Sequence, residues 1–257
     1  MGERLLLFDL DGTLLRTDKT VSGYTKEVLR RCRAEGMLLG LCTARGAHSA
    51  ARYEEALSPE VMITSGGALA RLRGETVLQA AFSQAELQGL LKAARAEGNA
   101  MLTIDAPEGH YWNRARAAMD DRADWCEPTI LEDGAFDGVA LKLCVHLPSP
   151  EAAARIASAA PGCAWGRFAG EDWYYFARPE ATKENAIRQV CAAAGVDPAD
   201  AVAFGDDRGD IGMLTLCGTG VAMGNALPEV KAAADAVTLD NDHDGVAVYL
   251  AHALLGE

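Results

Sequence analysis

Residues 5–14 have the sequence LLLFDLDGTL, and this stretch decides the fold. The short apolar run over residues 4–8 predicts a strand buried in a parallel sheet. Asp9 and Asp11 follow it, and because side chains alternate along an extended segment, both carboxylates point to the same side. Gly12 lets the backbone turn away directly after them. Since open α/β sheets bind ligands at the carboxyl ends of their strands, the sequence predicts a functional site here.

The two carboxylates are suited to phosphoryl transfer. One carboxylate can attack a phosphorus atom and become an aspartyl phosphate. The other, kept partly protonated, can donate a proton to the leaving oxygen and later deprotonate water. Two carboxylates this close repel each other, so we expect a hard cation, Mg²⁺, between them. An isolated DxD motif more often caps backbone amides. Here an apolar strand directly precedes the motif, which favours the catalytic interpretation.

The rest of the chain predicts two kinds of structure. Strands near residues 37–42 and 61–64 alternate with helices, and this rhythm returns after residue 183, which is typical of a Rossmann-like parallel sheet in an α/β core. The middle of the chain lacks it. Here we expect, in order, a helix over 83–97, a strand over 100–105, a helix near 117–125, a strand over 138–146, a helix over 150–160 and two strands within 163–177. We therefore predict a core over residues 1–80 and 180–257 and an inserted α+β domain over residues 81–179.

Composition narrows the partners and the compartment. The formal charge of −13 repels nucleic acid and anionic membranes, so neither is expected as a partner. It also repels phosphorylated substrates, so an anion site needs local positive charge. The seven cysteines are scattered without a CxxC pair, which favours reduced thiols. The N-terminal apolar run is too short for a signal peptide or a membrane span, so we expect a cytoplasmic protein. Nothing in the sequence fixes the oligomeric state.

The DxDGT motif resembles the first signature of the haloacid dehalogenase superfamily. The resemblance implies that Asp9 is the nucleophile and Asp11 the general acid/base, in agreement with the chemistry above. Thr43, in the segment Leu41-Cys42-Thr43-Ala44-Arg45, matches the second signature, whose hydroxyl donates to a phosphate oxygen. Lys183 matches the third, a lysine that neutralises the nucleophile and the incoming phosphate.

The fourth signature is matched by Phe204-Gly205-Asp206-Asp207-Arg208-Gly209-Asp210. The resemblance implies that Mg²⁺ is held by Asp9, by the backbone carbonyl of Asp11 and by Asp206. Asp210 is expected to orient Lys183 or a water molecule on the metal.

Two downstream segments, residues 221–226 and 240–246, look like those of the Cof-type branch of this superfamily. In the first, Asn225 is a candidate to approach the phosphate or Asp206, although a turn-forming role is equally open. Two positions depart from the Cof-type pattern, because Gly66 and Gly209 stand where asparagines are usual. These losses bring substrate preference and turnover into question.

The inserted domain resembles the larger α/β cap of Cof-type enzymes, since Thr43 and Lys183 are 140 positions apart. Such a cap closes over the site, excludes water and selects the leaving group. Within it, His110-Tyr111-Trp112-Asn113-Arg114 mixes aromatic and cationic groups. Tyr111, Trp112 and Arg114 are therefore candidates to bind a sugar or a small phosphate ester. A strand with a mixed surface explains the same segment.

The sequence thus predicts a magnesium-dependent phosphomonoester hydrolase that works through an aspartyl phosphate. Its expected substrates are small phosphorylated metabolites, with sugar phosphates as the leading candidates. A phosphatase for mannosyl-3-phosphoglycerate or a sucrose-phosphate-like compound is a nearer alternative with the same cap type. A catalytically weak phosphate-binding or regulatory protein is a rival from another class, motivated by Gly66 and Gly209. A phosphomutase is disfavoured by the position of the cap, and a DxD glycosyltransferase by the absence of any sign of a nucleotide-sugar pocket.

Overall fold

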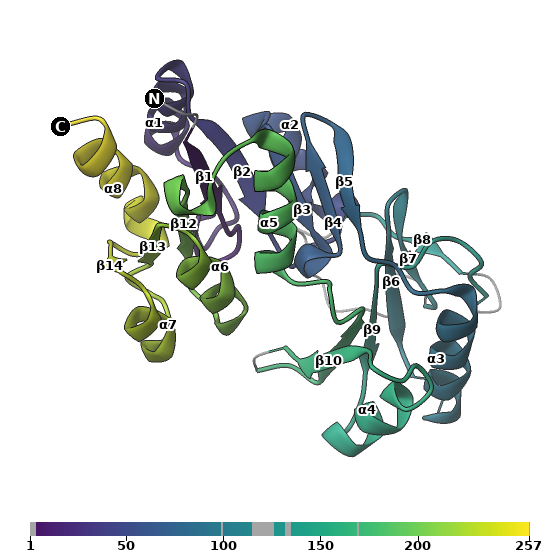
Figure 1. The fold of residues 1–257 in the computed structure, drawn as a ribbon. Coiled ribbons are helices and arrows are strands. Elements are labelled where there is room, and N and C mark those ends of the chain that lie inside the picture. Colours follow the sequence, from purple (N-terminus) through teal and green to yellow (C-terminus); the bar gives the residue numbers. More distant parts are fainter. Residues whose placement is uncertain (1–3, 99, 115–125, 132–134, 169, 257) are drawn as a thin grey trace.

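The computed structural model describes residues 4–98, 100–114, 126–131, 135–168 and 170–256. These residues form two sheets. The larger has eight strands in the order β14-β13-β12-β1-β2-β3-β4-β5, and the smaller has six in the order β10-β11-β9-β6-β7-β8. Figure 1 shows the larger sheet with both chain ends on one side of the molecule and the smaller sheet, with its two helices, on the other.

The larger sheet and its helices form the core. Its strands are β1 (Leu5–Phe8), β2 (Leu38–Cys42), β3 (Val61–Thr64), β4 (Leu69–Leu72), β5 (Glu75–Gln79), β12 (Val202–Gly205), β13 (Thr219–Ala222) and β14 (Ala236–Val237). Its helices are α1 (Gly23–Ala34), α2 (Ala47–Leu57), α5 (Lys183–Ala194), α6 (Ile211–Leu216), α7 (Pro228–Ala233) and α8 (Gly245–Leu254). Short 3-10 turns lie at η1 (Ser65–Gly67), η4 (Pro198–Asp200), η5 (Arg208–Asp210) and η6 (Asn241–His243).

β1 lies at the centre of this sheet. Its four side chains are at most 1% exposed, and it pairs in parallel with β12 on one side and β2 on the other. A strand covered on both faces must be apolar throughout, which explains the Leu-Leu-Leu-Phe run. The register aligns Phe8 with Phe204 and with Leu41. The predicted parallel α/β sheet is thus confirmed, and the segments after these three strands meet at one edge.

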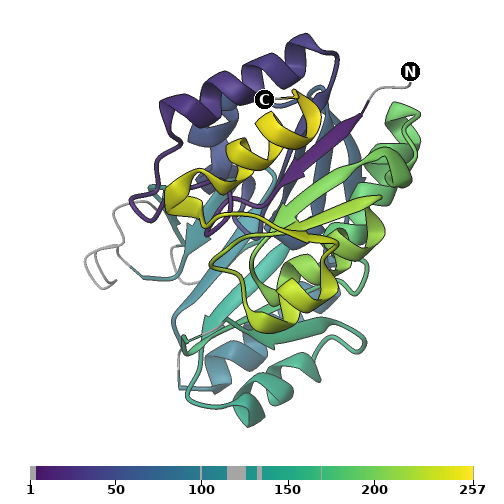
Figure 2. The ribbon, with the colours of Figure 1, turned by 90° about the vertical axis from the view of Figure 1, so that its left-hand side faces the viewer.

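Helices cover both faces of the core sheet (Figures 1 and 2). α5 and α6 contact each other and the strands on one face, while α1 packs beside α8 on the other. The Ser22 hydroxyl caps α1 by accepting from the Thr25 amide at 2.9 Å. α5 ends at Gly195, which adopts the left-handed conformation there.

The strands β4 and β5 were not predicted. They form an antiparallel hairpin that extends the parallel sheet beyond β3. Two residues join them, Arg73 and Gly74, both with positive φ, which is the backbone of a type I′ turn. Arginine is uncommon at such a position, so the turn has little signal in the residue pattern.

The smaller sheet belongs to the inserted segment. Its strands are β6 (Leu102–Ala106), β7 (Gly109–Trp112), β8 (Thr129–Ile130), β9 (Lys142–His146), β10 (Ala164–Arg167) and β11 (Trp173–Ala177), and its helices are α3 (Gln84–Ala96) and α4 (Pro150–Ala157). α3 and α4 pack on one face and close an apolar cluster separate from that of the core. We call this unit the cap. The domain boundaries at residues 80/81 and 179/180 stay a prediction, and the expected helix near 117–125 lies outside the described residues.

The cysteines, all of which the structure describes, form no disulfide bonds. All seven cysteines are free thiols, and burial raises the pKa of Cys217 to about 12 and that of Cys191 to about 11. These thiols therefore stay protonated near neutral pH. Within the described ranges, every helix is too short or too polar to cross a membrane.

Candidate active site

Asp9 lies immediately after β1, at the carboxyl edge of the core sheet. Its backbone amide donates to the Phe204 carbonyl at 3.0 Å, which continues the pairing of β1 with β12 by one residue. Its side chain is buried, and Oδ1 accepts from the Lys183 ammonium at 2.6 Å. A fixed, desolvated carboxylate at a strand end is well placed to act as a nucleophile.

Lys183 begins α5 and is buried between two carboxylates. Its Nζ donates to Asp9 Oδ1 and to Asp210 Oδ1, both at 2.6 Å. Burial alone would lower the pKa of this lysine, but the two carboxylates outweigh it and raise the pKa well above its ordinary value. Thr182 holds the residue in place, because its hydroxyl caps α5 by accepting from the Asn185 amide. Lys183 is therefore a permanent cation beside Asp9.

Asp206 and Asp210 follow β12 and complete the acidic crevice. The Thr13 hydroxyl donates to Asp206 Oδ1 at 2.7 Å. Asp210 uses both oxygens within the protein: Oδ1 accepts from Lys183, and Oδ2 accepts from the backbone amides of Asp206 and Asp207 at 2.9 and 3.0 Å. Asp210 thus bonds both to Lys183 and to the backbone that carries Asp206, and its role in orienting Lys183 stays a prediction.

The backbone around the crevice requires glycine at two places. Gly12 has φ +80, and a Cβ there would lie 2.3 Å from Asp206 Oδ2. A Cβ on Gly205 would lie 2.4 Å from the Asp210 Cβ. Both contacts are far below van der Waals distance. The two glycines therefore allow the segments after β1 and β12 to approach until their carboxylates share one site.

The carboxylates of this crevice suit a divalent cation. One oxygen from each of Asp9, Asp206 and Asp210 lies within 4.8 Å of the others. Burial raises the pKa of Asp9 well above its ordinary value, and the negative charges of Asp210 and Asp206 add to the effect. Burial likewise raises the pKa of Asp206 to about 6. One lysine leaves negative charge uncompensated, and oxygen ligands are those that Mg²⁺ prefers, so the residues fit the ion. Because both Asp210 oxygens are already bonded, Asp9 and Asp206 are the side-chain ligands that we favour.

Asp11 departs from the expectation of a partly protonated acid. Burial would raise its pKa, but Arg45 and Lys19 outweigh this and lower it to about 2. Arg45 donates through Nε to Oδ2 at 2.6 Å and through Nη2 to Oδ1 at 2.7 Å, and Lys19 donates to Oδ1 at 2.8 Å. In this arrangement two cations that we did not single out pair with Asp11 and hold its pKa low, and its role as a proton donor stays a prediction.

Thr43 and Asn225 were both predicted to bind phosphate. Thr43 lies directly after β2, lines the cavity beside Asp9, and its hydroxyl accepts from the Arg45 amide at 3.1 Å, which leaves the hydroxyl proton for another acceptor. Asn225 instead joins two loops: its amide nitrogen donates to the Gly12 carbonyl at 2.7 Å, and its oxygen accepts from the Asn241 amide at 3.1 Å. We interpret Asn225 as a structural bridge.

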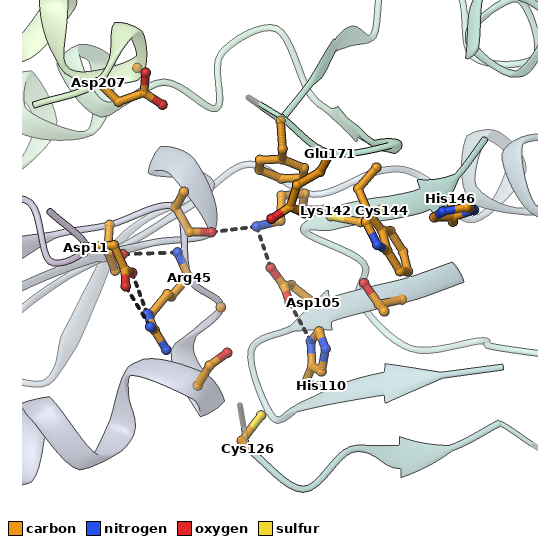
Figure 3. A pocket seen from close by; sticks show the side chains of 18 of the residues that line it. Asp11, Arg45, Asp105, His110, Cys126, Lys142, Cys144, His146, Glu171 and Asp207 are labelled. Carbon is orange, nitrogen blue, oxygen red and sulfur yellow. Dashed lines mark hydrogen bonds and ion pairs between the residues drawn. The ribbon is translucent and has the colours of Figure 1, made fainter. Parts of the chain in front are cut away.

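A cavity of about 940 Å³ extends from Asp9 to the face of the cap sheet that α3 and α4 leave uncovered. Figure 3 shows this space, with Asp11 and Arg45 on the core side and His110, Cys144 and His146 on the cap side. Core and cap thus contribute to one site, the arrangement expected of a cap that covers a reaction centre.

The three cap candidates do not share one environment. Trp112 lines the cavity together with His110. Tyr111 lies between them on β7, and because side chains alternate along a strand it points away; its ring packs against Phe136 with centroids 4.7 Å apart. Arg114 donates to the Asn113 carbonyl and is absent from the described lining of the cavity. Of the three, only Trp112 is placed to meet a substrate.

The two departures from the Cof-type pattern have different settings. Gly66 has φ +73 with no atom near a Cβ position, a conformation that asparagine also tolerates. Gly209 lines the cavity and has the same open surroundings. Replacing the usual asparagines therefore leaves the backbone unchanged and removes only the amide groups.

Sequence reasoning missed a second cluster of charges, Asp105, His110 and Lys142. All three are buried on the cavity side of the cap sheet, and Asp105 bonds to both of the others. The available signal was a charged residue in the middle of an apolar strand, at Asp105 in β6 and near the start of β9 at Lys142. Such residues are rarely buried without a partner.

Comparison with known proteins identifies the family. The family model for haloacid dehalogenase-like hydrolases matches residues 6–133 and 151–250. The chain belongs to this family. YxeH of Bacillus subtilis (strain 168) is 27% identical over 95% of this chain and 96% of its own length. The pyridoxal phosphate phosphatase YbhA of Escherichia coli (strain K12) is 28% identical over 97% of this chain and 98% of its own.

A solved structure of this family agrees in fold. The subclass IIB sugar phosphatase BT4131 superposes with a TM-score of 0.82 at 23% identity, covering 97% of this chain and 98% of that one. The agreement over the whole length includes both the core sheet and the cap. The resemblance drawn from the sequence is thus confirmed, and this haloacid dehalogenase-like hydrolase is a phosphatase of the Cof type.

Proposed function

We propose that this phosphatase is a magnesium-dependent phosphomonoester hydrolase that acts on small phosphorylated metabolites through a phosphorylated Asp9. One observation carries the proposal. The Asp9 carboxylate is buried at the end of β1, 2.6 Å from the Lys183 ammonium, and shares a crevice with the carboxylates of Asp206 and Asp210.

The reaction has two steps. In the first, an oxygen of Asp9 attacks the phosphorus, the bond from phosphorus to the ester oxygen breaks, and that oxygen leaves with a proton as an alcohol. In the second, water attacks the same phosphorus, its proton passes to a base, and the bond to Asp9 breaks to release phosphate. Lys183 offsets the charge of the transferred group in both steps, and the Thr43 hydroxyl, which lines the same cavity, is the candidate to donate to it.

Asp11 is the proton carrier in this scheme. As an ionised carboxylate it is a base for the water of the second step. For the first step it must gain a proton, which the ion pairs with Arg45 and Lys19 oppose. A phosphate dianion offers both cations another partner, so its arrival would weaken their hold on Asp11 and raise its pKa.

Mg²⁺ would be held by Asp9, Asp206 and the backbone carbonyl of Asp11. When bound, it neutralises the crowded carboxylates and the charge that develops on the transferred phosphoryl group. Without it, the raised pKa values of Asp9 and Asp206 favour protonation of the nucleophile and of its neighbour.

The cavity supports a small polar substrate. Its cap side carries the aromatic rings of Trp112 and Trp173 next to His110 and His146, groups that can stack on a sugar or a planar ring and bond to its hydroxyls. Sugar phosphates are therefore our first choice. Mannosyl-3-phosphoglycerate and sucrose-phosphate-like esters remain nearer alternatives, and the named activity of YbhA adds pyridoxal phosphate.

The thiols bear on where the enzyme works. Seven free cysteines, several of them buried among apolar side chains, suit a reducing compartment. We propose that the enzyme acts in the cytoplasm on small metabolites, with no nucleic acid or membrane partner.

Phosphate release from a panel of these esters, with and without Mg²⁺, tests the proposal. We expect release that depends on the metal and falls by at least about 10³-fold in Asp9→Asn, because that variant loses the nucleophile at nearly constant shape. Retained circular dichroism and Tm in the variant exclude misfolding. If wild type binds Mg²⁺ and phosphate but releases phosphate from no ester, the catalytically weak binding role replaces the enzyme.

A further inference from the structure

The cap carries a buried ion pair that the reaction scheme does not use. Lys142 Nζ lies 2.8 Å from Asp105 Oδ2, and His110 Nδ1 lies 2.7 Å from Asp105 Oδ1. All three side chains are less than 10% exposed. We call Asp105, His110 and Lys142 the cap clamp. A buried ion pair costs free energy of desolvation unless its remaining hydrogen bonds are satisfied, so its other partners matter.

Those partners lie on the core. Lys142 Nζ donates to the Ala44 carbonyl at 2.6 Å, and the Ser65 hydroxyl donates to Asp105 Oδ2 at 3.3 Å. Figure 3 shows Lys142 between Asp105 and the core loop. If the cap moved away, Lys142 would lose its carbonyl acceptor and Asp105 its hydroxyl donor. These two bonds to the core therefore exist only while the cap is docked.

The core segment that receives the clamp carries groups of the active site. Residues 43–46, which we call the receiving loop, hold Thr43 in the cavity that Asp9 also lines and Arg45 against Asp11. Ala44, which accepts from Lys142, stands between these two. A bond to this carbonyl fixes the backbone from which both neighbouring side chains project.

The receiving loop is shaped for this contact. Gly46 has φ −65 and ψ 158, extended backbone that any residue adopts. A Cβ there would nevertheless lie 2.6 Å from Asp105 Oδ1 and 2.7 Å from its carboxyl carbon. What excludes a side chain at Gly46 is therefore the approach of the cap carboxylate.

We propose that the cap clamp docks the cap on the receiving loop, and that Lys142 is a positioning residue for Thr43 and Arg45. Lys142 thus links the docked position of the cap to the geometry of the receiving loop. The kinetic part of this inference rests on the proposed phosphatase function, while the docking itself does not.

Two variants act on the contact from opposite sides. Lys142→Met removes the cation at similar length, and Gly46→Ala inserts a methyl group that meets only the cap carboxylate at close range. Lys92→Met is the matched control for the first, an exposed lysine of α3 in the same cap. Gly23→Ala is the control for the second, since a Cβ there meets no atom within 4 Å. Lys142→Arg keeps the positive charge and tests whether another cationic side chain can replace the lysine.

Hydrogen exchange of the full-length protein and hydrolysis of para-nitrophenyl phosphate are measured on all five variants. We expect Lys142→Met and Gly46→Ala to speed amide exchange in the receiving loop and to lower kcat/KM by about tenfold, because misplacement of positioned groups reduces catalysis. Exchange in α3 and α4 should be unchanged. Lys142→Arg should recover most of kcat/KM, and both controls should match wild type.

Other outcomes decide against the proposal. Wild-type exchange and kcat/KM in both variants would show that the clamp does not hold the loop. Faster exchange throughout α3 and α4 in Lys142→Met, together with a silent Gly46→Ala, would show that the ion pair stabilises only the cap itself. If no variant or wild type releases phosphate but the receiving loop still responds, docking stands and the proposed function fails.

Discussion

At the scale of single residues, the site is dominated by carboxylates that lie close together. Asp9, Asp206 and Asp210 share one crevice, and in the described part of the chain Lys183 is the cation bonded to two of them. The crowding is visible in Asp206, where burial raises the pKa to about 6 and neighbouring carboxylates add to it. A raised carboxyl pKa in the folded protein means that ionisation disfavours the fold.

The metal-free protein should therefore lose stability as pH rises through about 6. The Asp206 contribution is fully present below its unfolded pKa near 4, is lost by about pH 7, and amounts to at most about 3 kcal/mol. Mg²⁺ should reverse the loss, so its effect on Tm should be small near pH 5 and large near pH 7.5. Thermal unfolding with EDTA or Mg²⁺ measures this.

Asp206→Asn provides the control for this pH dependence. It should flatten the metal-free profile and remove most of the response to Mg²⁺, since it takes away both the titrating group and a ligand. An equal rise in Tm with Mg²⁺ at both pH values would contradict this view of the crevice.

Residue identities near the strand ends were predictable, but ion pairs were not. Asp9, Thr43 and Asp206 each follow a strand of the core, so topology alone brings them to one edge. The partners of Asp11 were missed because Lys19 lies in an irregular loop and Arg45 follows Thr43 by two positions, and no periodic pattern indicates where such long side chains reach.

At the scale of elements, the site depends on how α5 approaches the core. Lys183 is the first residue of α5, and the turn η1 passes directly beside it. Gly67 in that turn has φ +104, and a Cβ there would lie 2.2 Å from the Thr182 carbonyl oxygen. Because Gly67 has no side chain, the start of α5 can lie this close to η1, and Lys183 takes its position from that approach.

Gly67→Ala should combine backbone strain with a clash and lower the free energy of unfolding by about 3 kcal/mol. Gly66→Ala is the matched control, because it has positive φ but open space, and it should cost only about 1 kcal/mol. Urea unfolding measures both. Phosphate release should also fall in Gly67→Ala, since Lys183 is displaced from Asp9. Equal stability of the two variants would contradict the role of the close contact.

The elements also mark where sequence patterns are informative. The buried strands β1, β2 and β3 were predicted, because apolar runs are local signals. The β4–β5 hairpin was missed because Arg73 is uncommon at the first central position of such a turn. Tyr111 was misassigned because only the register of β7 within the cap sheet decides which face it takes.

At the scale of the whole molecule, function arises between two independently packed units. Each has its own apolar cluster, and the cavity uses the edge of one sheet and the open face of the other. The sequence predicted an inserted cap but not which of its side chains meet the core, since Asp105 and Lys142 are 37 positions apart and are joined only by pairing of β6 with β9. The fit of cap to core is a property of the assembled chain.

Turnover should pass through a phosphorylated Asp9. Acid quenching within the first turnover on the best ester, followed by mass spectrometry of the peptide that contains Asp9, detects this group. We predict a phosphoryl group on Asp9 that appears with Mg²⁺, disappears as phosphate is released, and is absent from Asp9→Asn. Phosphate release at the wild-type rate by Asp9→Asn, with no phosphoryl group on the wild-type peptide, would contradict it.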